Sequence, residues 1–251
     1  MLLSSISIKY LESISEKELR DSIFITGYQG FGMVGYITSR HIAEELELKR
    51  IGFIKTRYMP ESTFYSEKRG LAYPFELYYG VIDDKKLIVL VNHATPHPRE
   101  RTAYAEFVSE WLKKIGISKA ILVGGLDPAI RESETEKYRW IPIGGFNEKL
   151  DAPLLIEKFV VGPLALTMMF MEAHKIPGVV ILAYTELYRP DPRASAVAVE
   201  TISKIIGIRI STEKLIREAS IMEAFEREKE RLMKGIEGEV QRERQRYSMH
   251  V

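Results

Sequence analysis

The sequence predicts one α/β domain, a sheet with helices on both faces, followed by a charged helical arm. Short β-branched apolar runs alternate with amphipathic stretches from residue 23 to residue 207, which is typical of a sheet covered by helices. The 251 residues are 45% hydrophobic and 28% charged, which is enough apolar material for one globular core. After residue 210 charged residues dominate, and proline is absent up to residue 246.

The first half of the chain contains apolar runs that predict strands: Ile23–Thr26, Ile51–Tyr58, Leu77–Ile82 and Lys86–Asn92. Between the first two, Met33–Leu46 repeats apolar residues at helical spacing and predicts a helix. Asp83–Asp84 is a turn sequence, so we expect the last two strands to form a hairpin.

The second half continues the alternation. Apolar runs predict strands at Lys119–Val123 and Val179–Tyr184, and amphipathic or apolar stretches predict helices at Thr102–Ile115, Leu164–Ala173 and Ala194–Ile206. Glycine follows two of these helices, at Gly116 and Gly207, as is common at helix ends. We expect a core over residues 1–210.

The arm is predicted over residues 211–246, with a flexible tail at 247–251. It holds nine glutamates and nine lysines or arginines, and its apolar residues recur every three or four positions, which predicts one helix or two. A solitary amphipathic helix gains little stability by itself, so we expect the arm to bind a second copy or the core. The expected interaction residues are Leu215, Met222, Phe225, Leu232, Tyr247 and Val251.

Composition argues against several classes of protein. The 36 basic and 35 acidic residues are interspersed, so binding to nucleic acid is not expected. The chain has no cysteine, which removes disulfides and thiolate sites. It has neither a long apolar stretch nor an N-terminal signal pattern, so we expect a cytoplasmic protein without a membrane span.

A glycine-rich turn follows the first predicted strand. Gly30, Gly32 and Gly35 fit the spacing G-x-G-x-x-G, which can bring a phosphate close to a helix N-terminus. The acidic residue expected at the end of the next strand is missing, although Arg57 there would suit a 2′-phosphate. Two interpretations stay open: tight packing of the helix on the sheet, which we favour, or a site for a nucleotide or phosphorylated metabolite. Such a site would also use the glycines of two later turns, Gly124, Gly125 and Gly162.

Other polar residues give no clear catalytic pattern. His93 and His97 lie in a proline-rich loop after a strand, which indicates a rigid connection more than a metal site. The serines lie outside any nucleophile-elbow sequence, and the acidic run Glu132–Glu136 is typical of a solvated loop. We therefore expect no catalytic residue, metal or cofactor.

Segments along the chain carry a resemblance to a known family: Gly27–Gly35, Leu122–Leu126, Val161–Leu166, and Asp191–Ala196 leading to Ile205–Ile208. Their order and spacing resemble the second-subunit family of proteasome assembly chaperones, particularly its archaeal homologues, over residues 20–225. The resemblance implies a core similar to purine nucleoside phosphorylases without their catalytic equipment. It also implies a non-enzymatic chaperone that self-associates and binds proteasome α-subunits or another assembly chaperone.

The resemblance extends less well to the tail. Some family members end in a hydrophobic residue, a tyrosine and any residue, and this tripeptide inserts between α-subunits. Here the last three residues are Met249, His250 and Val251, with histidine in the tyrosine position. The sequence therefore leaves open which client the protein binds and how.

Overall fold

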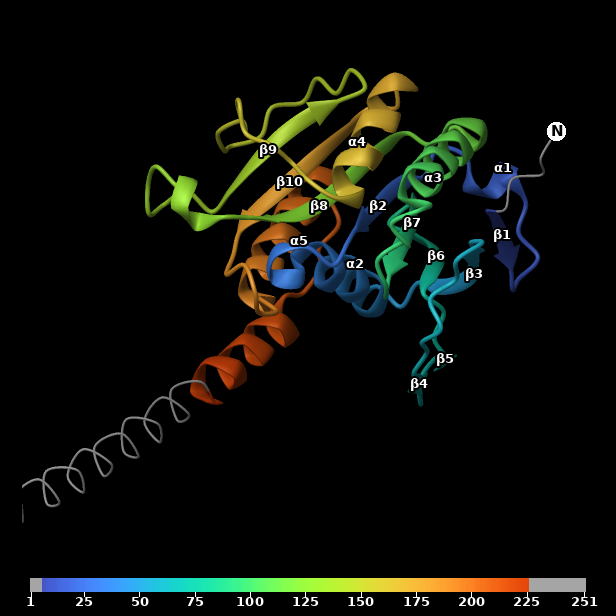
Figure 1. Ribbon diagram of the computed structural model, residues 1–251, viewed down its shortest axis with the longest axis horizontal. Coiled ribbons are helices and arrows are strands. Elements are labelled where there is room, and N and C mark those ends of the chain that lie inside the picture. Colours follow the sequence, from blue (N-terminus) through green and yellow to red (C-terminus); the bar gives the residue numbers. More distant parts are fainter. Residues whose placement is uncertain (1–5, 226–251) are drawn as a thin grey trace, which may run out of the picture. The chain divides into compact units, whose positions relative to one another are not determined.

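The computed structural model describes residues 6–225 of the chain. The chain divides into two compact units: the first ends at Thr212 and the second begins at Glu213. The first unit contains an eight-stranded sheet with the strand order β1-β3-β6-β7-β2-β8-β10-β9 (Figure 1). The predicted α/β fold is confirmed.

Four neighbouring strands form the parallel centre of the sheet: β7 (Lys85–Asn92), β2 (Ile23–Gly27), β8 (Lys119–Leu126) and β10 (Gly178–Tyr184). Antiparallel strands flank it, with β6 (Phe75–Ile82), β3 (Lys49–Lys55) and β1 (Ser7–Tyr10) on one side and β9 (Tyr138–Ile143) on the other. The central strands are buried on both faces, which explains why their sequences are continuously apolar.

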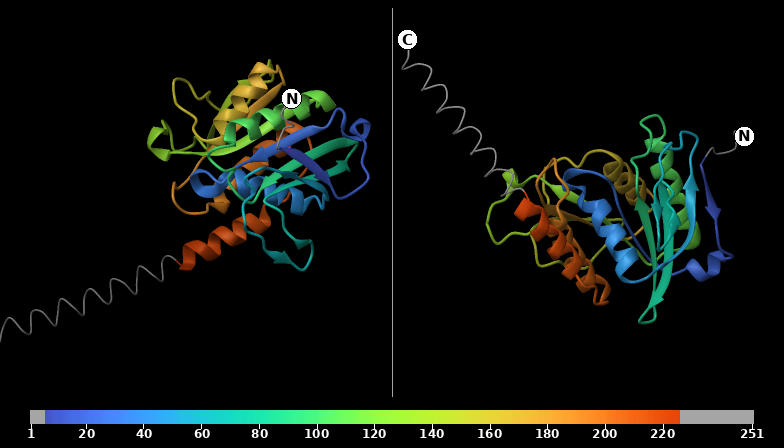
Figure 2. Two further views of the ribbon diagram at one scale, coloured as in Figure 1. Left: turned by 45° about the vertical axis from the view of Figure 1, so that its right-hand side comes forward. Right: turned by 90° about the horizontal axis from the view of Figure 1, so that it is seen from below.

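Helices cover the two faces of the sheet (Figures 1 and 2). On one face α2 (Val34–Glu45) packs beside α5 (Pro192–Ile206). On the other face lie α3 (Arg101–Ile115), α4 (Pro163–Ala173) and the short α1 (Glu16–Leu19). Two 3₁₀ helices, η1 (Phe31–Met33) and η2 (Pro128–Ile130), follow β2 and β8. Because β7, β2, β8 and β10 are parallel, their carboxyl ends lie at the same edge of the sheet.

Most predicted elements are present with shifted ends. The hairpin of β6 and β7 turns at Asp83 and Asp84, both with positive φ, and α3 ends at Gly116, whose φ is +74°. The expected strand at Ile51–Tyr58 is displaced, because β3 ends at Lys55. Several short elements were not predicted from the sequence: β1, β9, α1 and the small hairpin of β4 (Tyr65–Ser66) and β5 (Gly70–Leu71).

The second unit begins with a helix, and residues 213–225 are helical as far as the structure describes them. Of the expected interaction residues, Leu215, Met222 and Phe225 lie on this helix. Leu232, Tyr247 and Val251 lie outside the described residues, as does His250. Among residues 6–225, the structure contains no helix long and apolar enough to cross a membrane.

Candidate functional site

The carboxyl edge of the parallel strands is where open α/β sheets bind ligands, so the glycine-rich turn lies at the expected place for a site. The turn connects β2 to α2, and Gly32 exchanges backbone hydrogen bonds with Leu187 and Asp191 in the segment that follows β10. Whether it can hold a ligand depends on what already occupies the space around its glycines.

Two of these glycines allow the backbone of α2 to approach the sheet closely. A Cβ atom added to Gly27 would lie 2.4 Å from the Cα atom of Gly35. One added to Gly35 would lie 2.4 Å from the carbonyl oxygen of Val123 on β8. The two glycines therefore serve helix-to-sheet packing, as the favoured interpretation of the motif holds.

Gly32 is enclosed by the chain itself. Its φ is +59°, and an added Cβ would lie 1.9 Å from the side-chain oxygen Oγ1 of Thr185. The Thr185 hydroxyl in turn donates a hydrogen bond of 2.9 Å to Oδ2 of Asp191, whose Oδ1 accepts from the backbone N–H of Ala194 and caps α5. A phosphate at Gly32 would have to displace Thr185 and would meet the Asp191 carboxylate.

The N–H groups of the turn also have partners within the protein. Those of Gly30, Gly32 and Met33 donate to the carbonyl oxygens of Tyr28, Leu187 and Gly30, at 2.9, 3.3 and 2.9 Å. A phosphate loop needs such N–H groups free to point at the ligand. The geometry of this turn therefore favours structural packing over phosphate binding.

A cavity of about 270 Å³ lies beside the turn, and it brings together four of the six glycines singled out from the sequence. Gly30, Gly124, Gly125 and Gly162 line it, whereas Gly32 and Gly35 do not. Its other walls are mainly apolar side chains: Phe31, Val123, Leu126, Phe159, Val160, Val161, Pro163, Leu164 and Leu182. Tyr28 and Gln29 complete the lining.

Hydrogen bonds hold the walls of this cavity in place. The Tyr28 hydroxyl lies 2.8 Å from Oγ1 of Thr167 on α4, and Thr167 donates at 2.9 Å to the carbonyl oxygen of Pro163. The Gln29 amide donates at 2.7 Å to the carbonyl oxygen of His93. Burial raises the pKa of Tyr28 to about 12, against a smaller lowering by the Thr167 hydrogen bond, so its hydroxyl stays protonated at neutral pH.

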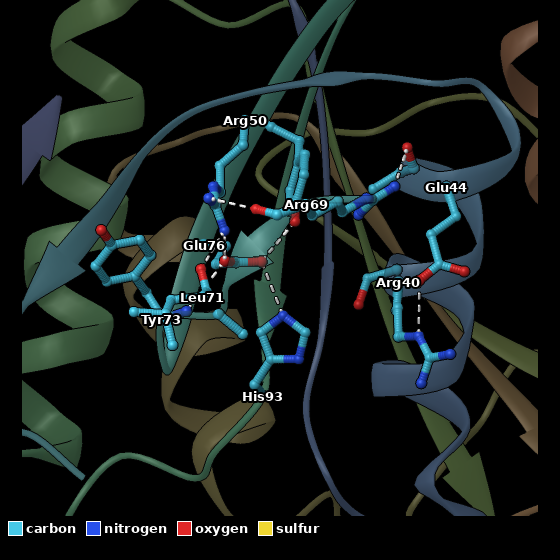
Figure 3. Close-up of polar contacts among 12 residues, drawn as sticks. Arg40, Glu44, Arg50, Arg69, Leu71, Tyr73, Glu76 and His93 are labelled. Carbon is cyan, nitrogen blue, oxygen red and sulfur yellow. Dashed lines mark hydrogen bonds and ion pairs between the residues drawn. The ribbon is translucent and has the colours of Figure 1, made fainter. Parts of the chain in front are cut away.

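A second cluster surrounds Glu76 on β6, whose side chain is buried (Figure 3). Its carboxylate accepts hydrogen bonds from four donors: Arg50 Nη1 at 2.6 Å, the Tyr73 backbone N–H at 3.0 Å, the Tyr78 hydroxyl at 2.5 Å and His93 Nε2 at 2.9 Å. Burial by itself raises the pKa of Glu76, but the hydrogen bonds from His93, Tyr78, Tyr73 and Arg50 together lower it to about 2.

The Glu76 cluster ties the small hairpin to the sheet. The guanidinium of Arg50 also donates to the carbonyl oxygens of Leu71 at 2.7 Å and Arg69 at 2.8 Å, and Arg69 reaches the carbonyl oxygen of Ala43 on α2 at 3.1 Å. With its carboxylate buried and fully paired, Glu76 has no room for a substrate. The arrangement is structural.

Both histidines of the proline-rich loop have partners within the protein. His93 is held by Glu76 and by the Tyr36 hydroxyl, which lies 3.2 Å from its Nδ1. His97 stacks on Tyr58 with ring centroids 4.7 Å apart. Among residues 6–225, no group of three His, Asp or Glu side chains could hold a metal ion.

The acidic loop differs from the prediction at one residue. Oε1 of Glu136 accepts a hydrogen bond of 2.6 Å from Arg139 on β9, and both side chains are 7% exposed. The pKa of Glu136 is lowered, mainly by this bond from Arg139. Glu136 is therefore part of a packed ion pair rather than of a solvated run.

Sequence reasoning missed Glu76, Thr185 and Asp191 as partners. Glu76 carried a usable signal, because it is a lone acid inside an otherwise apolar strand. Thr185 carried none, since its contact with Gly32 joins segments far apart in the chain.

Comparison with known proteins gives a consistent result. A model described as the PAC2 family matches residues 24–230. The structure is similar to that of Pyrococcus furiosus PbaA, an archaeal homolog of proteasome-assembly chaperone, with a TM-score of 0.77 and 25% identity over 99% of this chain and 100% of that one. It is also similar to P. furiosus PbaB, an archaeal proteasome activator, with a TM-score of 0.74 and 19% identity over 91% and 100%. An uncharacterized protein of Methanocaldococcus jannaschii is 27% identical over 224 residues, 86% of this chain and 88% of that protein.

Proposed function

We propose that this chain, which belongs to the PAC2 family, is a non-enzymatic assembly chaperone that binds proteasome α-subunits or a partner chaperone. The observation that carries the proposal is the match to PbaA over nearly the full length of both chains. PbaA is described as an archaeal homolog of proteasome-assembly chaperone.

The site geometry supports a role without catalysis. The glycine-rich turn is filled by Thr185 and by backbone, so the usual position for a phosphate is occupied by the protein. The buried Glu76 has all its hydrogen-bond partners within the chain. These contacts favour a stable scaffold that presents surfaces to other proteins. They count against the alternative of an enzyme or sensor for nucleotides or phosphorylated metabolites.

The arm is the surface that we assign to protein contacts. Met222 and Phe225 are 36% and 70% exposed on the helix at residues 213–225. Exposed apolar side chains on an amphipathic helix are typical of sites that bind another helix or a groove. In our proposal the protein forms a homo-oligomer through this helix, and the oligomer presents the client-binding surface.

The proposal is tested with purified components. The full-length chain is mixed with purified proteasome α-subunits from its source organism and separated by size-exclusion chromatography. We expect a co-eluting complex with the native chain and a weaker one with the double variant Met222→Ser, Phe225→Ser. Arg217→Gln, an exposed change on the same helix, is the matched control and should bind as the native chain does. If neither α-subunits nor a purified partner chaperone co-elute with the native chain, the proposal is wrong.

A further inference from the structure

Glycines in the lining keep the cavity beside the glycine-rich turn open. A Cβ atom added to Gly30 or to Gly162 would meet no atom within 4 Å, so both glycines face open space. At Gly124 the opposite holds: a Cβ would lie 2.7 Å from Leu164 and 3.0 Å from Leu182, so glycine there leaves room for these walls. The hydrogen bonds of Tyr28 and Thr167 fix the turn at Pro163 against β2.

The lining determines the chemistry of a ligand. The side chains that line the cavity, all within the described core, include no charged group. Its two polar side chains already have partners, since the Tyr28 hydroxyl pairs with Thr167 and the Gln29 amide with the carbonyl of His93. A charged ligand would lose its hydration without gaining a side-chain counter-charge, and the N-terminus of α4 at Gly162 would offer an anion only a partial positive charge. An apolar, uncharged ligand would lose only its contacts with water and would gain packing against the apolar walls, so its binding is favoured.

The size limits the ligand further. A dry apolar cavity of about 150 Å³ is enough to bind benzene, and drug-sized ligands occupy about 300 Å³ or more. A volume of about 270 Å³ lies between these limits and suits one substituted aromatic ring or a short branched chain. Access comes from the side where the walls are exposed: Phe31 is 41% exposed, Val161 68% and Phe159 96%.

We propose that this cavity is a binding site for a small, uncharged, largely apolar ligand of about the size of a substituted aromatic ring. The ligand lies between Phe31, Leu164 and the loop from Phe159 to Gly162, at the carboxyl edge of β2 and β8. The site shares Gly30, Gly124, Gly125 and Gly162 with the ligand site that the glycine spacing suggested, but it does not include the position at Gly32, which Thr185 fills. The inference goes beyond the chaperone proposal and does not depend on it.

The test uses 4-fluorotoluene as the probe and follows its ¹⁹F resonance during titration of the full-length protein. We expect saturable binding with a Kd below about 1 mM, and at least tenfold weaker binding of 4-fluorobenzoate, which has a similar ring but carries a charge. Linear, non-saturable changes with the native protein, or a benzoate that binds as well as the toluene, would overturn the proposal.

Variants locate the bound probe. Gly30→Leu places a side chain into the open space, at a residue whose φ of −120° lies outside the left-handed region, and should reduce affinity at least tenfold. Ala173→Leu introduces the same leucine side chain at an exposed position of α4 outside the cavity and should leave affinity unchanged. Phe159→Ala, at a side chain too exposed to support the fold, should weaken binding at least threefold. A circular dichroism spectrum like that of the native protein shows that each variant is folded. If all three variants bind the probe with the affinity of the native protein, the probe binds elsewhere and the proposal is wrong.

Discussion

The side-chain oxygen of Thr185 lies where a side chain on Gly32 would begin, 1.9 Å from the Cβ position of that residue. This contact joins the segment after β10 to the glycine-rich turn after β2. A sequence motif that resembles a phosphate loop is thereby closed by a hydroxyl group of the same chain. The motif serves the packing of α2, and the function that we propose rests on surfaces rather than on a catalytic pocket.

Replacing Gly32 with alanine should destabilise the protein by about 2–4 kcal/mol, since it combines a left-handed backbone with a clash against Thr185. Gly30→Ala is the matched control in the same turn, because its Cβ would enter open space and its φ is −120°. We expect the control to change stability by less than about 1 kcal/mol. Urea unfolding measures both, and equal effects would contradict the assigned role of Gly32.

Nucleotides should not stabilise the protein against heat. A ligand at one hundred times its dissociation constant adds about 2.7 kcal/mol to stability, which a thermal-shift measurement detects readily. The N–H groups of Gly30, Gly32 and Met33 are already used within the turn, so we expect no shift with ATP, GTP, NAD or NADP. A saturable shift that disappears in Gly32→Ala would revive the nucleotide-binding interpretation.

Glu76→Gln should cost about 3 kcal/mol at pH 7, because Arg50 and His93 lose a buried charged partner. The same carboxylate makes stability depend on pH. Its pKa is about 2 in the folded protein against an ordinary value of 4.5, so its contribution is complete above pH 4.5 and is lost as the pH falls toward 2. Urea unfolding of the native chain and the variant from pH 7 to pH 2.5 should therefore converge.

The control for this titration is Glu16→Gln. Glu16 pairs with Lys114 at 2.6 Å, but the carboxylate side chain is 52% exposed, so the change should cost less than about 1 kcal/mol. A native-to-Glu76→Gln difference that stays constant down to pH 2.5 would show that the Glu76 carboxylate is not held as described.

The arm should determine the oligomeric state. Met222→Ser with Phe225→Ser removes two exposed apolar side chains from the helix at residues 213–225 and should reduce the mass measured by light scattering. Arg217→Gln should leave the mass unchanged. A double variant with the native mass would show that the contact between copies lies elsewhere, and the same mass after removal of all residues beyond Ile210 would exclude the arm altogether.

The parallel centre of the sheet was predictable because strands that are buried on both faces have continuously apolar sequences. All seven residues of β10 are buried, and the sequence there is apolar throughout except at its glycine and its terminal tyrosine. β9 was not predictable in this way. It contains Arg139 and Pro142, and the charge of Arg139 is acceptable in a strand only because Glu136 and Glu132 pair with it.

The candidate site was predictable only in part. The spacing of Gly30, Gly32 and Gly35 located the turn at the correct edge of the sheet, and Gly124, Gly125 and Gly162 do lie near it. The sequence could not show which glycines face a cavity and which face backbone, because that depends on contacts with Thr185 and Val123. Such contacts form between segments that are far apart in the chain, so the local sequence around each glycine does not indicate them.

The most direct measurement of the central claim is recovery of the protein's partners from a lysate of its source organism. The tagged full-length chain is the bait, and the tag alone is the control. Recovered proteins are quantified by mass spectrometry. The account predicts enrichment of proteasome α-subunits or of a second assembly chaperone over the control. Recovery of neither, from a lysate in which both are detected, would contradict it.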